Sequence, residues 1–361
     1  MLIYFAVLLV ATLAVHLAGR TRNKVESFLM YAIAFVSLVL IAGLRSRFVG
    51  TDSGYNALHF ERTEELADVG RGGVEPGIFL LSWLGKLIYD DYVVLFTLVA
   101  VVVALCFLQG IRRLSVNPTV SVFVLLTSGI FYFSFNGLRQ GVAAAILFLA
   151  IAAFYQRKFW VFLACIAAAC FFHYSAIVFF PMYFLVPRKN DLRYNVVLLI
   201  LVVLAVAAFS AGVQAVGQLQ PRYVAYGAAS EGGRKGLVYS AFLCSLGIFF
   251  LYFRRHVRQH RPLFDSLLNV FLLGLVVVVV AVIKGTSPSG ILRLNIYFNV
   301  SQILLWPIVF VNLQGNRHRA LFLTAFVGLY LVYYGMTLQA YSNLVPYTLN
   351  PLVQDWFSTL F

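Results

Sequence analysis

Residues 131–155 read FYFSFNGLRQGVAAAILFLAIAAFY, in which a polar Asn-Gly-Leu-Arg-Gln segment directly precedes an apolar run over 138–155. A run of this length fits the roughly 17–25 residues that a transmembrane helix needs. A charged residue at the edge of such a run is costly near lipid, so it is usually paired, exposed to a water-filled cavity, or functional. Both the fold class and the candidate site follow from this pattern, because it recurs along the chain.

Apolar runs of similar length fill most of the 361 residues. The mean hydropathy is +0.90, with 62% hydrophobic and only 11% charged residues, which is typical of a multi-pass membrane protein. The expected spans are 2–19, 28–44, 91–110, 119–135, 138–155, 159–172, 174–187, 194–213, 236–253, 264–283, 291–312 and 320–338.

The predicted fold is therefore an all-α, polytopic integral membrane protein with about twelve transmembrane helices, and residues 1–361 form a single integral membrane domain. The loop 45–90 contains a segment, 76–89, that is apolar on one helical face and too short to span, so we expect an interfacial amphipathic helix there. Glu75 precedes it and is expected to cap it. The stretch 159–187 is expected to be either two short spans or one broken, re-entrant element.

The basic residues lie in alternate loops, which sets the orientation through the positive-inside rule. The predicted cytoplasmic loops, which include Arg112 and Arg113, hold 16 of the 27 basic residues and three of the 13 acidic ones. Both termini and the loop 45–90 then face the non-cytoplasmic side. The formal charge of +14 is thus a topology signal, and binding to nucleic acid is not expected.

Asn136, Arg139 and Gln140 form the first candidate group. Asn136 is expected to be the N-cap of the span 138–155, which places Arg139 and Gln140 in the first helical turn. A helix N-terminus offers free N–H groups and the positive end of a dipole, so this arrangement suits a phosphate. The alternative is that a neighbouring carbonyl or carboxylate holds Arg139.

Further arginines repeat this geometry on the same predicted side. Arg45 and Arg47 follow the span 28–44 and either reach the headgroups or bind a ligand. Arg293 lies in the first turn of the span 291–312, and Tyr297, at i+4, is placed to bond to the same ligand. Asp52 is either a catalytic base or the counter-ion of Arg45 or Arg47.

His173 lies at the expected break between two short helices and is followed by Tyr174 and Ser175. A lone histidine usually packs as a satisfied core residue, but non-helical backbone at membrane depth is tolerated where it lines a cavity. His173 is therefore a candidate general base. The four cysteines have no metal-like spacing, and neither a metal site nor a cofactor is expected.

Five motifs together resemble the EpsG-type proteins, which belong with the Wzy-type polymerases of bacterial exopolysaccharide and O-antigen. They are GLRSRFVGTDSGY (Gly43–Tyr55), EPGIFLL (Glu75–Leu81), FYFSFNGLRQGVAAAI (Phe131–Ile146), FHYSAIVFFPMYFL (Phe172–Leu185) and NLVPYT (Asn343–Thr348). The resemblance implies a fold similar to that of GT-C-type membrane glycosyltransferases. It also implies a metal-independent transfer of a glycan from undecaprenyl pyrophosphate to an acceptor repeat unit, on the outer face of the bacterial cytoplasmic membrane.

Under this resemblance His173 activates the acceptor hydroxyl, with Asp52 as the rival base. The implied partners are undecaprenyl-pyrophosphate-linked oligosaccharide, membrane lipids, a chain-length regulator and a flippase. The candidate residues for binding pyrophosphate or glycan are Arg45, Arg47, Tyr55, Asn136, Arg139, Gln140, Ser175, Arg293 and Tyr297.

Two other functions stay open from the sequence. A flippase for lipid-linked oligosaccharide would place cations along a cavity reaching both sides of the membrane, whereas the polar motifs here gather at one predicted side. A membrane acyltransferase using His173 would need an acyl donor and would leave the glycan at its normal length.

Overall fold

The computed structural model describes residues 1–63, 75–186, 189–219, 233–285, 290–313 and 317–360. In these residues every element is helical, and the one β-type contact is an isolated antiparallel bridge between Arg45 and Leu349. Six of the described helices are long and apolar enough to cross a membrane. A seventh span results if Ile291–Asn299 and Gln302–Asn312, which are bent by 43°, count as one. The prediction of an all-α, multi-pass membrane protein is confirmed, while twelve spans and the likeness to GT-C enzymes stay predictions.

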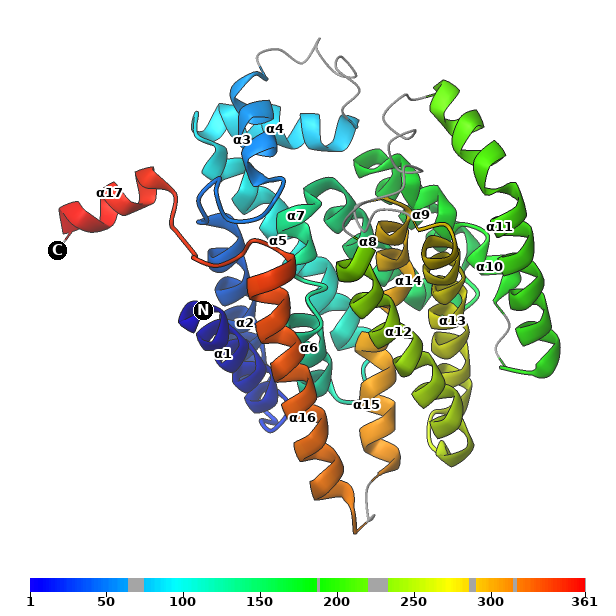
Figure 1. The fold of residues 1–361 in the computed structure, drawn as a ribbon. Coiled ribbons are helices and arrows are strands. Elements are labelled where there is room, and N and C mark those ends of the chain that lie inside the picture. The colour runs from blue at the N-terminus through cyan, green and yellow to red at the C-terminus, as the bar shows by residue number, and fades with distance from the viewer. Residues whose placement is uncertain (64–74, 187–188, 220–232, 286–289, 314–316, 361) are drawn as a thin grey trace. The chain divides into compact units, whose positions relative to one another are not determined.

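The chain divides into two compact units, Met1–Ile177 with Leu313–Phe361, and Val178–Asn312 (Figure 1). The helices of the first unit are α1 (Leu2–Ala18), α2 (Lys24–Gly43), α3 (Ser53–Glu61), α4 (Pro76–Ile88), α5 (Tyr92–Leu114), α6 (Pro118–Thr127), α7 (Phe133–Asn136), α8 (Leu138–Tyr155), α9 (Phe159–Phe172), α16 (Arg319–Met336) and α17 (Pro351–Leu360).

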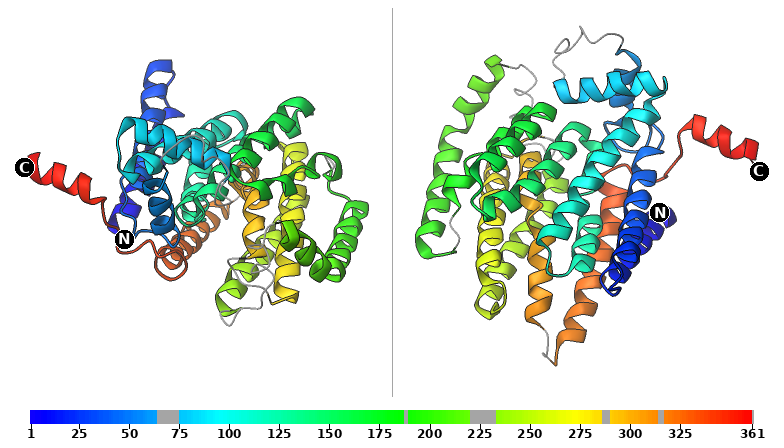
Figure 2. Two further views of the ribbon diagram at one scale, coloured as in Figure 1. Left: turned by 90° about the horizontal axis from the view of Figure 1, so that it is seen from above. Right: turned by 180° about the vertical axis from the view of Figure 1, so that it is seen from behind.

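The core of the first unit forms where α2, α5 and α8 pack side by side, with α1 against α2 and α9 against α8. The buried faces are apolar and aromatic, and the close packing of these side chains stabilises the contacts between the helices. The short helix α4 runs across the ends of the long helices, and its contacts are with α5 and α9 (Figures 1 and 2). This crossing places the start of α4 beside the end of α9.

The expected span 119–135 is interrupted in the structure. Helix α6 ends at Thr127, the backbone of Gly129 has φ of +78°, and the chain resumes as the short helix α7. A positive φ is incompatible with a continuing right-handed helix and is readily adopted by glycine. The turn at Gly129 therefore separates α7 from α6 and lets α7 lead directly into α8.

The second unit contains α10 (Met182–Leu185), α11 (Leu192–Leu219), α12 (Gly233–Phe253), α13 (Arg261–Ile283), α14 (Ile296–Asn299) and α15 (Gln302–Asn312). Helix α13 is central to it, with packing contacts to α11, α12, α14 and α15. Between α9 and α10 the chain forms a 3-10 helix, Tyr174–Phe179, so the helix is broken after His173.

Candidate active site

A buried carboxylate joins two of the candidate residues, Arg139 and His173. Glu75 Oε2 lies 2.5 Å from Arg139 Nη1, and Glu75 Oε1 lies 2.6 Å from His173 Nδ1. The Glu75 side chain is 0% exposed, against 22% for Arg139 and 10% for His173. We call these three residues the ionic cluster. The Glu75 carboxylate is fully buried, while Arg139 and His173 keep some access to the outside.

The position of Glu75 follows from how α4 begins. Pro76 occupies the first turn of α4, where a missing N–H costs nothing, and Glu75 is the extended N-cap residue before it. Glu75 therefore occupies the expected N-cap position, but its side chain makes no capping hydrogen bond. Instead the carboxylate points to Arg139 and His173, because two charge-assisted bonds stabilise it more than one backbone N–H would.

Gly77 brings α4 close enough to α9 for these bonds to form. A Cβ on Gly77 would lie 2.7 Å from Phe172 Cδ1 and 2.9 Å from the backbone oxygen of Phe171. These two phenylalanines are the last residues of α9 before His173. Only a residue without a side chain permits this approach of α4 to the end of α9.

Replacing Gly77 with Ala is expected to lower catalytic activity about tenfold, because the added methyl group forces α4 away from α9 and separates Glu75 from His173. The matched control is Gly328→Ala in α16, where a Cβ meets nothing within 4 Å. Elongation of a lipid-linked glycan, the activity that the sequence resemblance predicts, would be compared between the two purified variants at equal amounts of folded protein. Equal activity of the two variants would contradict the role given to Gly77.

Arg139 lies in the first turn of α8, as the sequence predicts, but Asn136 does not cap that helix. Asn136 is the last residue of α7, and the N-cap of α8 is Gly137. The Asn136 side-chain oxygen instead accepts a hydrogen bond of 2.8 Å from the backbone N–H of Thr51. The capping prediction is therefore wrong, because a long-range partner takes the place of the local one.

This bond fixes the segment after α2 against the junction of α7 and α8. Gly50 has φ of +99°, and a Cβ there would lie 2.7 Å from the backbone oxygen of Phe135. The hydroxyl of Ser53 donates to the same carbonyl over 3.1 Å. The residues Gly50–Ser53 thus pack directly against the turn that presents Arg139.

Arg45 is fixed in the interior of the first unit. It is 2% exposed, and its Cζ lies 4.0 Å from the ring centroid of Phe96 and 4.3 Å from that of Phe135. Its guanidinium donates to the carbonyl of Ala42 and over 3.4 Å to Ser53 Oγ, and Nη2 has no hydrogen-bond partner among the described residues. Arg45 therefore does not reach lipid headgroups. It is a buried cation that holds the end of α2 against α5 and α7.

Most of the other candidates of the first unit lie nearer its surface. Arg47 forms an ion pair with Glu61 and stacks over Tyr92, with its Cζ 4.7 Å from the ring centroid. Asp52 precedes α3 and accepts a hydrogen bond of 3.1 Å from the Thr51 hydroxyl. The remaining three candidates of this unit are the exposed Tyr55, the buried Gln140 and the half-buried Ser175.

Arg293 and Tyr297 belong to the second unit. Arg293 lies in a 3-10 turn, Ile291–Asn295, that leads into α14, and its side chain is half-buried. Tyr297 lies in α14 and is fully buried. The structure thus places Arg293 at a helix start, as predicted, and Tyr297 in the core of its unit.

His59 in α3 was not among the residues expected to form the site. Burial lowers its pKa, and the positive charge of Arg139 lowers it further. Its Nδ1 is buried and has no hydrogen-bond partner among the described residues. A second, neutral imidazole therefore lies within electrostatic reach of the ionic cluster.

The lowered pKa of His59 predicts that acidification destabilises the protein. The unfolded chain takes up a proton on this residue near pH 6.5, and the folded chain takes it up only at lower pH, so stability is full above pH 6.5 and falls below it. His59→Gln should lose less thermal stability between pH 7.5 and 5.5 than the wild-type protein does. The exposed His256 supplies the control variant, His256→Gln, which should behave like wild type. An unchanged loss in His59→Gln would contradict this assignment.

The helices and the ionic cluster define a multi-pass membrane protein with a candidate site for an anion and a proton acceptor. A model of the EpsG family matches residues 28–349, and the chain belongs to that family. EpsG is a Wzy-like polysaccharide polymerase family, so the predicted family is confirmed. The matched range contains the whole ionic cluster. No curated protein and no solved structure matches the chain.

Proposed function

We propose that this protein polymerises lipid-linked oligosaccharide repeat units by transferring a glycan from undecaprenyl pyrophosphate to an acceptor repeat unit. Membership of the EpsG family points to polysaccharide polymerisation in general. The observation that carries the finer proposal is the ionic cluster, in which Glu75 bonds to both Arg139 and His173. One partner can bind a phosphate and the other can accept a proton, which are the two requirements of this transfer.

The bond between the anomeric carbon of the donor sugar and the pyrophosphate oxygen breaks, and its electron pair leaves with the pyrophosphate. Arg139 stabilises the charge that develops on this leaving group, because it lies at the N-terminal end of α8, where the helix dipole adds to its own charge. Gln140 from the same turn supports this binding, while Arg47 and Arg293 bind the acceptor lipid or the outer parts of the donor.

The acceptor hydroxyl forms the new bond to the anomeric carbon and gives its proton to His173. The carboxylate of Glu75 accepts the Nδ1–H of His173, so the lone pair of Nε2 is the proton acceptor. This arrangement selects one tautomer of the ring, as an orienting acid does in catalytic triads. Asp52 remains the rival base from the sequence, with its own carboxylate 3.1 Å from the Thr51 hydroxyl.

We further propose that the reaction needs no metal ion and takes place on the outer face of the bacterial cytoplasmic membrane. The orientation is supported by the excess of basic residues in alternate loops. Arginine supplies the positive charge on the leaving group that a divalent cation supplies in other transferases. A chain-length regulator and a flippase are the protein partners that such a polymerase would have.

The direct test is to supply purified full-length protein in lipid vesicles with a defined repeat unit on undecaprenyl pyrophosphate, with and without a chelator. We expect a ladder of glycans that each differ by one repeat unit, unchanged by the chelator. Movement of the substrate across the bilayer without elongation would identify a flippase. Acylated glycan of unchanged length would identify an acyltransferase, and loss of the ladder with the chelator would overturn metal independence.

A further inference from the structure

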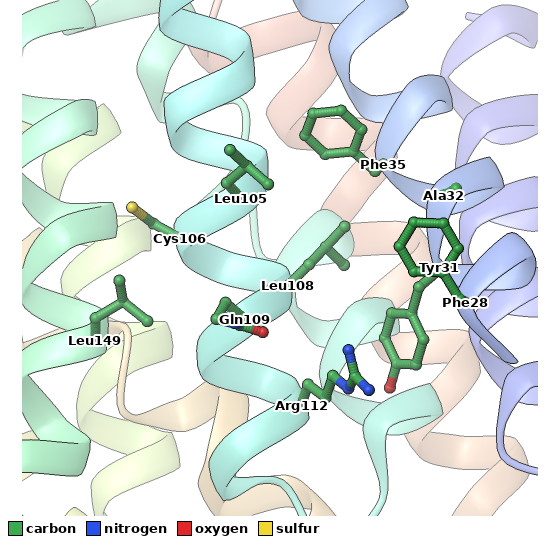
Figure 3. Close-up of a pocket in the computed structure, with 10 residues that line it drawn as sticks. All are labelled: Phe28, Tyr31, Ala32, Phe35, Leu105, Cys106, Leu108, Gln109, Arg112 and Leu149. Atoms are coloured by element: carbon green, nitrogen blue, oxygen red, sulfur yellow. The ribbon is translucent and has the colours of Figure 1, made fainter. Parts of the chain in front are cut away.

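A groove on the membrane-spanning part of the first unit has the shape and polarity of a lipid site. It has a volume of about 580 Å³ and lies between α2 and α5, with one residue from α8 (Figure 3). Ligand sites in proteins have volumes of about 300–1,000 Å³. The lining residues are Phe28, Tyr31, Ala32, Phe35, Leu105, Cys106, Leu108, Gln109, Arg112 and Leu149.

The groove is apolar along its length and polar at one end. Phe35 and Leu105 lie toward the apolar end, while Tyr31, Gln109 and Arg112 gather at the other (Figure 3). Arg112 Cζ lies 5.7 Å from the ring centroid of Tyr31. In Figure 3 the guanidinium of Arg112 and the hydroxyl of Tyr31 point toward one another. Such a lining matches a molecule with a hydrocarbon chain and one polar end.

The charge at the polar end is positive and is not neutralised by a neighbouring acid. Arg112 lies in the last turn of α5 and is exposed, and no carboxylate pairs with it in the part of the chain that the structure describes. Arg113 follows it in the same turn. A cation at the C-terminus of a helix is favourable without any ligand, because it interacts with the negative end of the helix dipole. The apolar groove beside Arg112 additionally offers space for a hydrocarbon chain. The complementary ligand is therefore an anion attached to a hydrocarbon.

This groove is separate from the ionic cluster. Helix α4, which carries Glu75 at its start, meets α5 at Val94 and Leu95, near the beginning of that helix. Arg112 lies about 17 residues further along α5, which corresponds to about 25 Å at 1.5 Å per residue. The groove residue of α8 is Leu149, ten residues or about 15 Å beyond Arg139, so a phosphate bound at Arg112 is too far from Arg139 to be the leaving group of the proposed reaction.

We propose that the groove binds an anionic phospholipid of the cytoplasmic leaflet, with an acyl chain along Phe35 and Leu105 and the phosphate at Arg112. The predicted orientation puts the last turn of α5 at the cytoplasmic boundary, where anionic headgroups lie. Basic pockets between transmembrane helices on that side are known sites for such headgroups. The acyl chain fills the space between α2 and α5 and holds these two helices together.

The test uses purified full-length protein and native mass spectrometry to measure bound phosphatidylglycerol and its apparent Kd. We expect Arg112→Gln to weaken binding about fivefold, the effect of about one basic residue at an anionic surface. Arg113→Gln is the matched control, because Arg113 shares the turn but does not line the groove, and it should bind like wild type. Ala32→Phe fills the groove, keeps Arg112, and should also weaken binding.

Three comparison ligands distinguish an anionic phospholipid from other molecules that carry a phosphate. Phosphatidylethanolamine should bind more weakly than phosphatidylglycerol, and inorganic phosphate should not raise the melting temperature at matched concentration. Equal losses in Arg112→Gln and Arg113→Gln would overturn the site and reduce the effect to surface charge. Undecaprenyl phosphate binding more tightly than phosphatidylglycerol would overturn the phospholipid assignment, and it would leave the proposed polymerase reaction untouched.

Discussion

Replacing Glu75 with Gln is expected to lower the rate of glycan polymerisation about 10³-fold. The variant keeps the size of the side chain but removes the charge that serves both Arg139 and His173. A Gln amide offers one acceptor oxygen and one NH₂ group, so it cannot accept from both partners as the carboxylate does. The loss combines a poorly oriented base, which is worth 10²–10⁴-fold, with a displaced arginine. Polymerisation would be measured by elongation of a defined lipid-linked repeat unit.

Two further variants distinguish the effect of the Glu75 charge from the effect of side-chain length and from the effect of removing any carboxylate. Glu75→Asp keeps the charge and shortens the side chain by one methylene, so we expect an intermediate loss of about tenfold to 10²-fold. Glu61→Gln removes a carboxylate from the partly exposed pair with Arg47 and should change the rate less than about threefold. Equal losses in Glu75→Gln and Glu61→Gln would contradict the special role of Glu75. A melting temperature for each variant identifies any loss that comes from unfolding.

Replacing His173 with Gln is expected to lower the same rate about 10²-fold, because proton transfer from the acceptor hydroxyl loses its base. Asp52→Asn is the competing experiment, and it should lower the rate less than about fivefold. Asp52 lies at the start of α3, whereas His173 bonds to a fully buried carboxylate that fixes its tautomer. A fixed tautomer is what a general base needs before the acceptor arrives.

The opposite ranking of these two variants would reassign the base to Asp52 and leave His173 as a packing residue. Rates measured over a range of substrate concentrations also distinguish a loss of chemistry from a loss of substrate binding in each variant. Loss of a base lowers the maximal rate with little change in the substrate concentration at half-maximal rate, whereas a weakened glycan site raises that concentration.

The sequence predicted the parts of the fold that depend on local pattern. Apolar runs gave the helical, multi-pass character, and the helix starting at Leu138 places Arg139 in its first turn. A break at His173 was also expected. In the structure α9 ends at Phe172, and a 3-10 helix begins at Tyr174. Each of these depends on residues within one or two helical turns, where composition is informative.

The partners of these residues could not be predicted, because they are distant in sequence. Glu75 lies 64 residues from Arg139 and 98 from His173, and its local context suggested only a helix cap. Asn136 likewise looked like a cap and instead bonds to Thr51, 85 residues away. Capping rules consider only hydrogen bonds between a side chain and the nearby backbone. They do not predict a bond to a residue of another helix. The close approach that Gly77 permits was equally hidden, because a Pro-Gly pair in a sequence ordinarily marks a turn.

The shared carboxylate also couples events at its two ends. In the proposed reaction, a pyrophosphate that draws Arg139 toward itself would weaken one of the two bonds to Glu75 and leave the carboxylate bonded mainly to His173. By reciprocity, a change in the bond between Glu75 and His173 would alter the affinity for the donor. Arrival of the donor would in this way prepare the acceptor side, so hydroxyl activation would be confined to complexes in which a glycan is ready to be transferred.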